Sequence, residues 1–380
     1  MIILGGFLLV LGCIFAGCLL IQLLFYWLFF ARFAFHKHKM QKKETIPAVS
    51  VVICTRNESG YIQQFLPCIL TQDYPNYEVV LVNDNSTDDS ENILREMQQY
   101  HQHLQIVTVS TQFRQENDRK LALAVGIKSA KNDLVLVTGA DCLPRSSSWI
   151  TEMVNCSSEK QPMVLGYCSN KEKKGFLNLL ISFDTVYTAM CYFSFALVGR
   201  PYMGMGKNIL LSKKLFLGDS NYLSSYKTSS VNNALPISNM AKQKNTSISY
   251  NYNSQTGSVF RYESFSHWRN EKRKNAQSYK YYKFINRFCL RLYGVTGFLF
   301  YVSFIACLLS TTDTFILGIL AALFCLRMLS QWVIFAKSCN KLKEKKLLGY
   351  IPLFDVFFTF LMPLTRGISY FKKGTNGSRI

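Results

Sequence analysis

The sequence predicts an α/β protein whose main domain is a mostly parallel, doubly wound, Rossmann-like sheet, anchored by apolar helices at both ends. From Val49 onward, short β-branched runs alternate with helical segments, which is typical of a parallel sheet. Two of these runs stop on carboxylates, Asp84 and Asp141. Long apolar stretches flank the alternating region, and a chain of 380 residues has room for one sizeable domain plus such elements.

The first segment, residues 1–34, predicts a transmembrane helix. Ile2 to Ala31 contains no charged residue, and this run exceeds the roughly 20 apolar residues that cross a bilayer. A cleaved signal peptide would show a basic start, a shorter apolar core and a small-residue cleavage site, none of which precedes Arg32. We therefore expect an uncleaved anchor.

The sheet domain follows at residues 35–286, with a nucleotide-binding half at about 48–145. Thr55 and Glu58 have capping-box spacing, and Asp88 and Glu91 can cap the next helix. The predicted elements are strand 49–54, a helix through Leu70, strand 78–83, a helix to about Tyr100, strand 104–109, helix 119–129 and strand 134–138. Ligands of open α/β sheets bind outside the carboxyl ends of the strands, so Asp84 and Asp141 mark an expected site.

The second half, about 146–286, opens with the nearly apolar run from Phe176 to Val198. Asn178, Ser182, Asp184 and Thr185 interrupt this run, so we expect an amphipathic helix lying on the membrane and not a span. Residues 219–255 are rich in Ser, Asn and Tyr and predict a mobile loop with one helix.

The C-terminal region predicts a transmembrane hairpin over residues 287–337 and a third apolar segment over 347–371. Pro352, Asp355, Pro363 and Arg366 are costly in lipid, so the third segment is expected to be re-entrant or interfacial. For Arg327, inside the hairpin, we favour snorkelling toward the headgroups.

Basic residues gather beside the apolar segments and set the expected topology. Lysines and arginines follow the first helix, precede the hairpin and follow it, which predicts a cell-membrane protein with its sheet domain on the cytoplasmic side. The net charge of +20 is therefore assigned to contact with membrane lipids, and no nucleic-acid partner is expected. The twelve cysteines show no metal-ligand spacing and are interpreted as reduced.

Asp141 is the sharpest single candidate. A carboxylate just past a strand end can ligate Mg²⁺ or Mn²⁺, which bridge diphosphate oxygens and neutralise a departing nucleoside diphosphate. Capping of the following turn is the competing interpretation, and the residue alone does not separate the two.

Five ordered motifs between about Val49 and Lys274 resemble those of the membrane-bound family 2 glycosyltransferases, which have the glycosyltransferase A fold. They are VSVVICTRNE, VVLVNDNSTDDS, RKLALAVGI, LVTGADC and GMGKNILLSKKLF. The resemblance implies an inverting, hexosyltransferase-like enzyme. Such an enzyme moves a sugar from a nucleotide-diphosphate sugar to a lipid-linked or glycan acceptor, as in polysaccharide or cell-envelope glycan biosynthesis.

The resemblance also implies roles for individual residues. Thr55, Asn57, Glu58 and Asp84 would cradle the base and ribose, Lys120 would approach the nucleotide, Asp141 would hold the metal, and Gly206 with Asn208 would face the donor and acceptor. Each role has a structural alternative. Thr55 and Glu58 can simply cap a helix, Asp84 can shape its turn, Lys120 can be a solvated helix residue, and the loop of Gly206 can be a tight turn.

Two departures from the family pattern bear on catalysis. The metal motif normally has acids at both ends, but here it reads Gly139, Ala140, Asp141. Asn232 and Asn233 occupy the expected place of the general base, and Asn cannot accept a proton at neutral pH. The catalytic base is thus not assigned; Asp219 and Glu263 are possible substitutes.

The motif of chain-extending members is also eroded, since it reads His267 to Lys272, which disfavours processive polymerisation. Two hypotheses remain open. One is an active, non-processive transferase, favoured by the intact nucleotide half, and the other is an inactive binding or scaffold protein in a glycan-assembly system. A translocating polysaccharide synthase would need more spans and an intact acceptor motif.

Overall fold

The computed structural model describes residues 2–38, 43, 45–109, 119–170, 174–218, 234–237, 239–259 and 264–360. These residues form two compact units. The first comprises Met1–His36, Val186–Ser194 and Lys283–Ile380, and the second comprises Lys37–Thr185 and Phe195–Tyr282.

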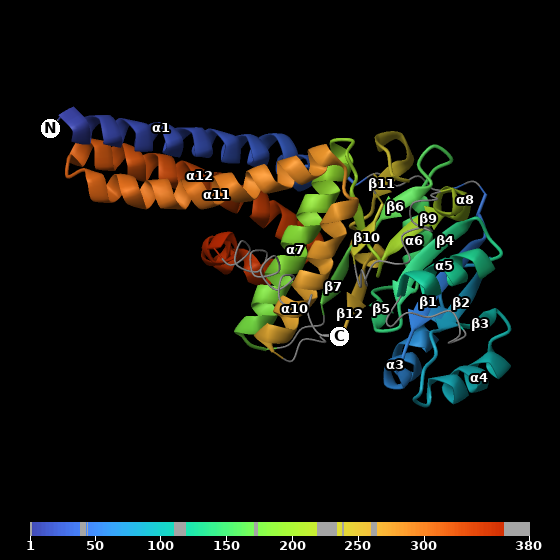
Figure 1. Cartoon of the computed structure of the whole chain (residues 1–380). Coiled ribbons are helices and arrows are strands. Elements are labelled where there is room, and N and C mark those ends of the chain that lie inside the picture. The colour runs from blue at the N-terminus through green and yellow to red at the C-terminus, as the bar shows by residue number, and fades with distance from the viewer. Residues whose placement is uncertain are drawn as a thin grey trace, which may run out of the picture. The chain divides into compact units, whose positions relative to one another are not determined.

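The second unit is built on a seven-stranded sheet with the order β11-β6-β9-β4-β1-β2-β3 (Figure 1). Its strands are β1 Val49–Thr55, β2 Tyr77–Asn83, β3 Leu104–Thr108, β4 Leu134–Gly139, β6 Met163–Leu165, β9 Ile209–Ser212 and β11 Thr246–Ile248. β1 pairs in parallel with β2 and β4, β2 with β3, and β6 with β11, whereas β9 runs antiparallel to β4 and β6. The predicted mostly parallel sheet is confirmed.

The central strands form because their residues are β-branched or apolar and are buried on both faces of the sheet. Every residue of β1 is buried, as are all residues of β2 after Tyr77. The helices of this half are α3 Ser59–Leu70, α4 Ser90–Tyr100, α5 Arg119–Ser129 and α6 Trp149–Asn155. A Cβ added to Gly126 of α5 would lie 2.7 Å from side-chain carbons of Val52 and of Val82, so α5 lies directly on β1 and β2.

Two small sheets continue the second unit. β12 Thr256–Ser258 lies between β5 Cys142–Pro144, to which it is antiparallel, and β7 Cys168–Asn170, to which it is parallel. β8 Met203–Met205 pairs antiparallel with β10 Ala234–Pro236, and the short helix α8 Lys213–Leu217 follows β9.

Residues 219–233 and 238 of the region expected to be a loop with one helix lie outside the described residues. Its described parts, residues 234–237 and 239–255, contain β10, β11 and the 3₁₀ turns η4 Gln243–Asn245 and η5 Tyr252–Ser254. Ser and Asn compete locally for backbone hydrogen bonds, which favours short turns over a full helix here.

Helix α7, Phe176–Leu197, differs from the surface helix that its apolar run predicts. It is 78% buried, whereas the three other long apolar helices, whose mean hydropathy is higher, are 28%, 33% and 33% buried. The expectation of an apolar face exposed to lipid is therefore wrong for α7, because protein covers most of its length. A later helix of the second unit, α10, spans Phe265–Ala276, and the 3₁₀ turn η6 spans Gln277–Tyr281.

The first unit contains long helices that run side by side (Figure 1). A continuous helical stretch consists of α1 Ile2–Leu24, the π-helical turn η1 Phe25–Phe30 and α2 Ala31–Ala34. The predicted hairpin is α11 Phe284–Ser310 and α12 Thr314–Leu342, followed by the 3₁₀ turn η7 Lys345–Tyr350 and helical residues 351–360. Phe15 of α1 stacks on Phe300 of α11 with ring centroids 5.0 Å apart.

Length and composition make α1 through α2, α7, α11 and α12 candidate membrane spans. Residues 361–380 lie outside the described residues, and they include residues 361–371 of the third predicted apolar segment.

Arg327 does not snorkel, contrary to the interpretation that its sequence context favours. Its side chain is 1% exposed and forms an ion pair with Asp355, with Nη1 2.8 Å from Oδ2. The guanidinium also donates to the Tyr301 hydroxyl and to Gln22 Oε1. The partners come from α1, α11 and residues 351–360, which is why the pattern of α12 alone does not reveal them.

Candidate functional site

The carboxyl ends of β1, β2 and β4 lie at one edge of the large sheet, as the sequence predicts. In the strand register Cys54 is opposite Gly139, and Thr55 is opposite Asn83. The Asp84 amide donates to the Thr55 carbonyl at 2.9 Å, which continues the β1–β2 pairing past the strand end. The chain reverses its direction of winding between β1 and β4, and such switch points hold ligands in this class of sheet.

The loop after β1 is held by polar contacts with the loop after β2. Asn57 adopts the left-handed conformation with φ 52°, which Asn tolerates better than most residues. Its Oδ1 accepts from the Thr87 amide at 2.8 Å, and its own amide donates to Ser86 Oγ at 3.1 Å. The described contacts of Asn57 thus brace the two loops against each other.

The predicted capping box is only partly present. Thr55 Oγ1 donates to Glu58 Oε2 at 3.2 Å, and Glu58 is the N-cap residue of α3 without a side-chain cap bond of its own. Asp88 performs the capping instead: its Oδ2 accepts from the Ser59 amide, and its Oδ1 accepts from the Ser90 amide and hydroxyl. One carboxylate therefore serves the starts of both α3 and α4.

Asp84 and Lys120 are both buried near this edge, at 7% and 3% exposure. Lys120 is thus not a solvated helix residue. Its Nζ lies over the ring of Tyr281, 4.9 Å from the centroid, which is a cation–π contact.

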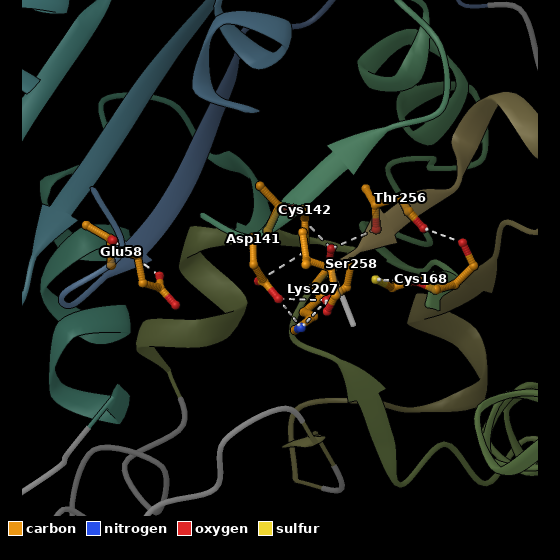
Figure 2. A network of polar contacts seen from close by, with 11 residues as sticks. Glu58, Asp141, Cys142, Cys168, Lys207, Thr256 and Ser258 are labelled. Atoms are coloured by element: carbon orange, nitrogen blue, oxygen red, sulfur yellow. Dashed lines mark hydrogen bonds and ion pairs between the residues drawn. The ribbon is translucent and has the colours of Figure 1, made fainter. Parts of the chain in front are cut away.

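Asp141 lies just past the end of β4 and is fully buried. Its Oδ2 is 2.6 Å from Lys207 Nζ and accepts from Ser258 Oγ, also at 2.6 Å. Lys207 Nζ in turn donates to Ser258 Oγ at 2.5 Å, which closes a triangle of polar contacts. Figure 2 shows these three side chains, from three separate segments of the chain, pointing toward one another.

The sequence interpretation missed two residues of this site, Lys207 and Ser258. Two hydroxyls fix the backbone of Lys207, because Thr138 Oγ1 and Thr256 Oγ1 each donate to the Lys207 carbonyl at 3.1 Å. The sequence does place Lys207 between Gly206 and Asn208, in the short turn GMGKN, so its charge lies beside two predicted site residues.

The turn around Gly206 and Asn208 has a strong structural role. Asn208 is fully buried; its Nδ2 donates to the carbonyls of Tyr167 and Ser254 at 2.8 Å, and its Oδ1 accepts from Trp149 Nε1 at 3.1 Å. The side-chain amide of Asn208 thus links its own turn to the segments that contain Tyr167, Ser254 and Trp149.

The Cys142 thiol beside Asp141 is a poor nucleophile. Cys142 is fully buried, and this desolvation raises the pKa of its thiol well above the usual value, with the Cys168 side chain and the Asp141 carboxylate acting in the same direction. A neutral Cys142 donates its S–H toward Asp141 Oδ1, with Sγ 3.6 Å from that oxygen.

The residues considered for the general base lie outside the described part of the chain: Asn232, Asn233, Asp219 and Glu263. The degenerate acceptor motif is described. Trp268 is 2% exposed and its Nε1 donates to Asp184 Oδ2 at 3.3 Å, while Lys272 Nζ lies 2.6 Å from Asp184 Oδ1.

The donor atoms around Asp141 do not fit a divalent ion. No group of three or more His, Cys, Asp or Glu side chains suited to a metal occurs within the described ranges. Gly139 stands where a second carboxylate is expected, and the Asp141 oxygen is in contact with an ammonium. A divalent ion placed 4 Å from that ammonium would be repelled by roughly 8 kcal/mol at an effective dielectric constant of about 20.

Comparisons with known proteins agree with the fold of this domain. Residues 50–193 match the family model described as glycosyl transferase family 2. Over 98 residues the chain is 33% identical to the dolichyl N-acetyl-alpha-D-glucosaminyl phosphate 3-beta-D-2,3-diacetamido-2,3-dideoxy-beta-D-glucuronosyltransferase of Methanococcus voltae, a match that covers 25% of this chain and 30% of that protein. Over 118 residues it is 28% identical to the poly-beta-1,6-N-acetyl-D-glucosamine synthase of Staphylococcus epidermidis, covering 30% of this chain and 27% of that protein.

These matches span only about a third of the curated relatives' length. Among solved structures, the mannosyltransferase PcManGT from Pyrobaculum calidifontis, in complex with GDP-Man and Mn²⁺, superposes with a TM-score of 0.54 at 15% identity, covering 94% of this chain and 99% of that one. This likeness shows the fold. Residues 50–193 thus match glycosyl transferase family 2, in a chain whose fold is similar to that of this mannosyltransferase and which has four candidate membrane spans among its described residues.

Proposed function

We propose that this protein is a membrane-bound glycosyltransferase that moves a sugar from a nucleotide-diphosphate sugar to a lipid-linked or glycan acceptor. The observation that carries the proposal is the common edge of β1, β2 and β4, where Thr55 ends β1, and Asp84 and Asp141 follow the ends of β2 and β4. The position of this edge, at a switch point of a mostly parallel sheet, favours a nucleotide ligand.

The loop after β1 and the loop after β2 support the donor half of this proposal. Asn57 and Asp88 fix these loops through bonds to Thr87, Ser59 and Ser90, so the edge is shaped before a ligand arrives. Preorganised polar groups bind a charged ligand with little ordering cost. We assign Thr55, Glu58 and Asp84 to the base and ribose.

Mg²⁺ or Mn²⁺ held by Asp141 stays a prediction. The mannosyltransferase with the same fold was solved with Mn²⁺, and a bound divalent ion would neutralise the diphosphate. The contacts of Asp141 with Lys207 and Ser258 do not favour that ligand.

The membrane helices support an acceptor that is presented at a lipid surface. The helical run ending at Ala34, together with α11 and α12, leaves most of its apolar surface exposed within the structure. Basic residues next to these helices favour a cell membrane with the sheet domain on the cytoplasmic face. Sugar transfer at that face suits a lipid-linked or glycan acceptor.

Single transfer, with inversion, is the mode that we propose. Trp268, in the position of the chain-extending motif, is buried and bonded to Asp184, so its ring is not an open platform for a growing glycan. The inverting outcome rests on the family alone.

The experiment is a donor screen with purified protein in detergent. Each nucleotide-diphosphate sugar is incubated with membrane lipid extract, and released UDP or GDP is measured. Asp84→Asn is expected to reduce release strongly, since Asp84 stands at the centre of the proposed donor edge, whereas the exposed Asp89→Asn is the matched control. Absence of release and of nucleotide binding with every donor would refute the proposal.

A second candidate function is a nucleotide-sugar-binding scaffold without turnover. The ion pair between Asp141 and Lys207 favours it, because the expected metal ligand is already engaged. Binding of UDP or GDP without turnover on any donor or acceptor would support this candidate over the transferase.

A further inference from the structure

Lys207 lies where the family chemistry places a metal ion against Asp141. Its Nζ is 2.6 Å from Oδ2 of Asp141, which lies just past the end of β4, beside the switch point. Its side chain is 10% exposed, in contrast to the fully buried Asp141. The lysine side chain is therefore the more accessible member of the pair.

Ser258 and the backbone contacts hold this ammonium in one place. Ser258 Oγ donates to Asp141 and accepts from Lys207, and the carbonyl of Lys207 is fixed by Thr138 and Thr256. A lysine normally loses considerable side-chain freedom when it binds an anion. Here that freedom is already lost in the folded protein.

The charges of the site explain what such a lysine can do. Diphosphate oxygens accept hydrogen bonds from ammonium groups, and lysine binds phosphates as a point charge. A lysine paired with one carboxylate is neutral as a pair, whereas a divalent ion on one carboxylate carries a net positive charge. The Lys207 arrangement can orient a diphosphate with a fixed dipole, at lower affinity than a metal would give.

Building on the proposed donor function, we propose that the Lys207 ammonium, positioned by Asp141 and Ser258, binds the donor diphosphate in place of a divalent ion. Donor binding in this protein is then independent of metal. Lys207 is the phosphate-binding residue, and Asp141 and Ser258 are positioning residues.

Titration calorimetry of the full-length protein in detergent tests this, with UDP and GDP as probes, in EDTA and then in Mn²⁺. We expect binding in EDTA that Mn²⁺ leaves nearly unchanged. Lys207→Met should weaken UDP or GDP binding roughly 10-fold or more, because a charged hydrogen bond is lost, and should weaken UMP or GMP binding far less. Lys214→Met, at an exposed lysine of α8, is the matched control.

Lys207→Met leaves a buried carboxylate without its cation and can fail to fold. The double variant Lys207→Met with Asp141→Asn removes both charges, keeps the side-chain volumes and should also lose metal-free binding. Unimpaired binding by this double variant would overturn the role of Lys207.

The remaining outcomes separate the two proposals. Binding only in the presence of Mn²⁺ would overturn the metal-free inference and leave the donor function intact. No binding of UDP or GDP under either condition would overturn both.

Discussion

Asp88 shows how one exposed residue organises the donor edge. Its two oxygens accept bonds from the backbone of Ser59 and from Ser90, so it joins the starts of α3 and α4. Desolvation raises its pKa, but the bonds from Ser90 and Ser59 outweigh this effect and lower the pKa below the usual value. The Asp88 carboxylate therefore stabilises the folded protein fully at pH values above the pKa that Asp88 has in the unfolded chain. This stabilisation is lost as the pH falls through the lower pKa that Asp88 has in the folded protein.

Asp88→Ala is expected to destabilise the protein by about 0.5–2 kcal/mol, as other helix caps do, because two helix starts lose an acceptor. The thermal midpoint in detergent should fall at pH 7, and the difference from the wild type should shrink when the pH is lowered below the usual Asp pKa of about 4. Asp89→Ala, on a neighbouring exposed residue, is the control. An equal difference at both pH values would contradict the cap assignment.

Asn208 is the buried counterpart of this arrangement. Asn208→Ala would remove the hydrogen-bond partner of the Tyr167 and Ser254 carbonyls and of the Trp149 indole N–H. Each buried group left without a partner typically costs about 1–3 kcal/mol of stability. We expect a loss of several kcal/mol in the free energy of unfolding. Asn92→Ala, whose bond to Asp89 is exposed, should change the denaturation midpoint little; similar losses for the two variants would contradict the structural role of Asn208.

Sequence reasoning at the residue scale selected Asp141 but not its partners. Asp141, Lys207 and Ser258 come from β4's end, the turn between β8 and β9, and β12, and nothing local in the chain relates these segments. A carboxylate after a strand predicts a cation, and the residue alone does not say whether that cation is a metal or an ammonium.

At the scale of elements, the alternating pattern predicted the strands and helices of the nucleotide half closely. β1, β2, β3 and β4 begin and end within a residue of expectation, and α5 matches its predicted bounds. The reason is physical: β1, β2 and β4 are buried on both faces, so their apolar runs and polar boundaries coincide with the elements. For α7 the same reasoning failed, because the apolar and polar residues of a single helix do not show which other segments of the protein cover it.

The contact of α5 with the sheet gives a prediction for this scale. Gly126→Ala places a methyl group 2.7 Å from carbons of Val52 and Val82, and such overpacking typically costs about 1–3 kcal/mol. Gly60→Ala, in α3 with open space around the new methyl group, should instead stabilise the protein by roughly 0.5–1 kcal/mol.

The measurement is the thermal midpoint of the Gly126→Ala variant compared with that of the Gly60→Ala variant, since both substitutions add one methyl group to a helix. Val82→Ala should partly restore the Gly126→Ala variant by making room for the methyl group. Equal shifts of the midpoint for Gly126→Ala and Gly60→Ala would contradict the close packing of α5 on the sheet.

For the whole molecule, the helices of the first unit are joined by the ion pair of Arg327 with Asp355, together with Tyr301 and Gln22. Removal of one partner from a buried ion pair typically costs about 3–5 kcal/mol, because the other charge is left unpaired. Arg327→Leu alone should therefore strongly destabilise the helices in detergent.

The double variant Arg327→Leu with Asp355→Leu should be more stable than Arg327→Leu alone, since no unpaired charge remains. The measurement is the thermal midpoint of helix unfolding by circular dichroism. Arg291→Leu, on the less buried part of α11, is the control. A double variant as unstable as the single one would show that the pair itself does not join the helices.

The Arg327–Asp355 pair also has a consequence for biosynthesis. With α12 inserted in a membrane as proposed, the ribosome would make α12 before residues 351–360, so Arg327 would enter the translocon while its counter-ion is still unsynthesised. Insertion scales place the cost of a lone arginine at a helix centre at about 2.5–3.5 kcal/mol. Nascent chains truncated before Asp355 should accordingly integrate α12 less efficiently than longer ones.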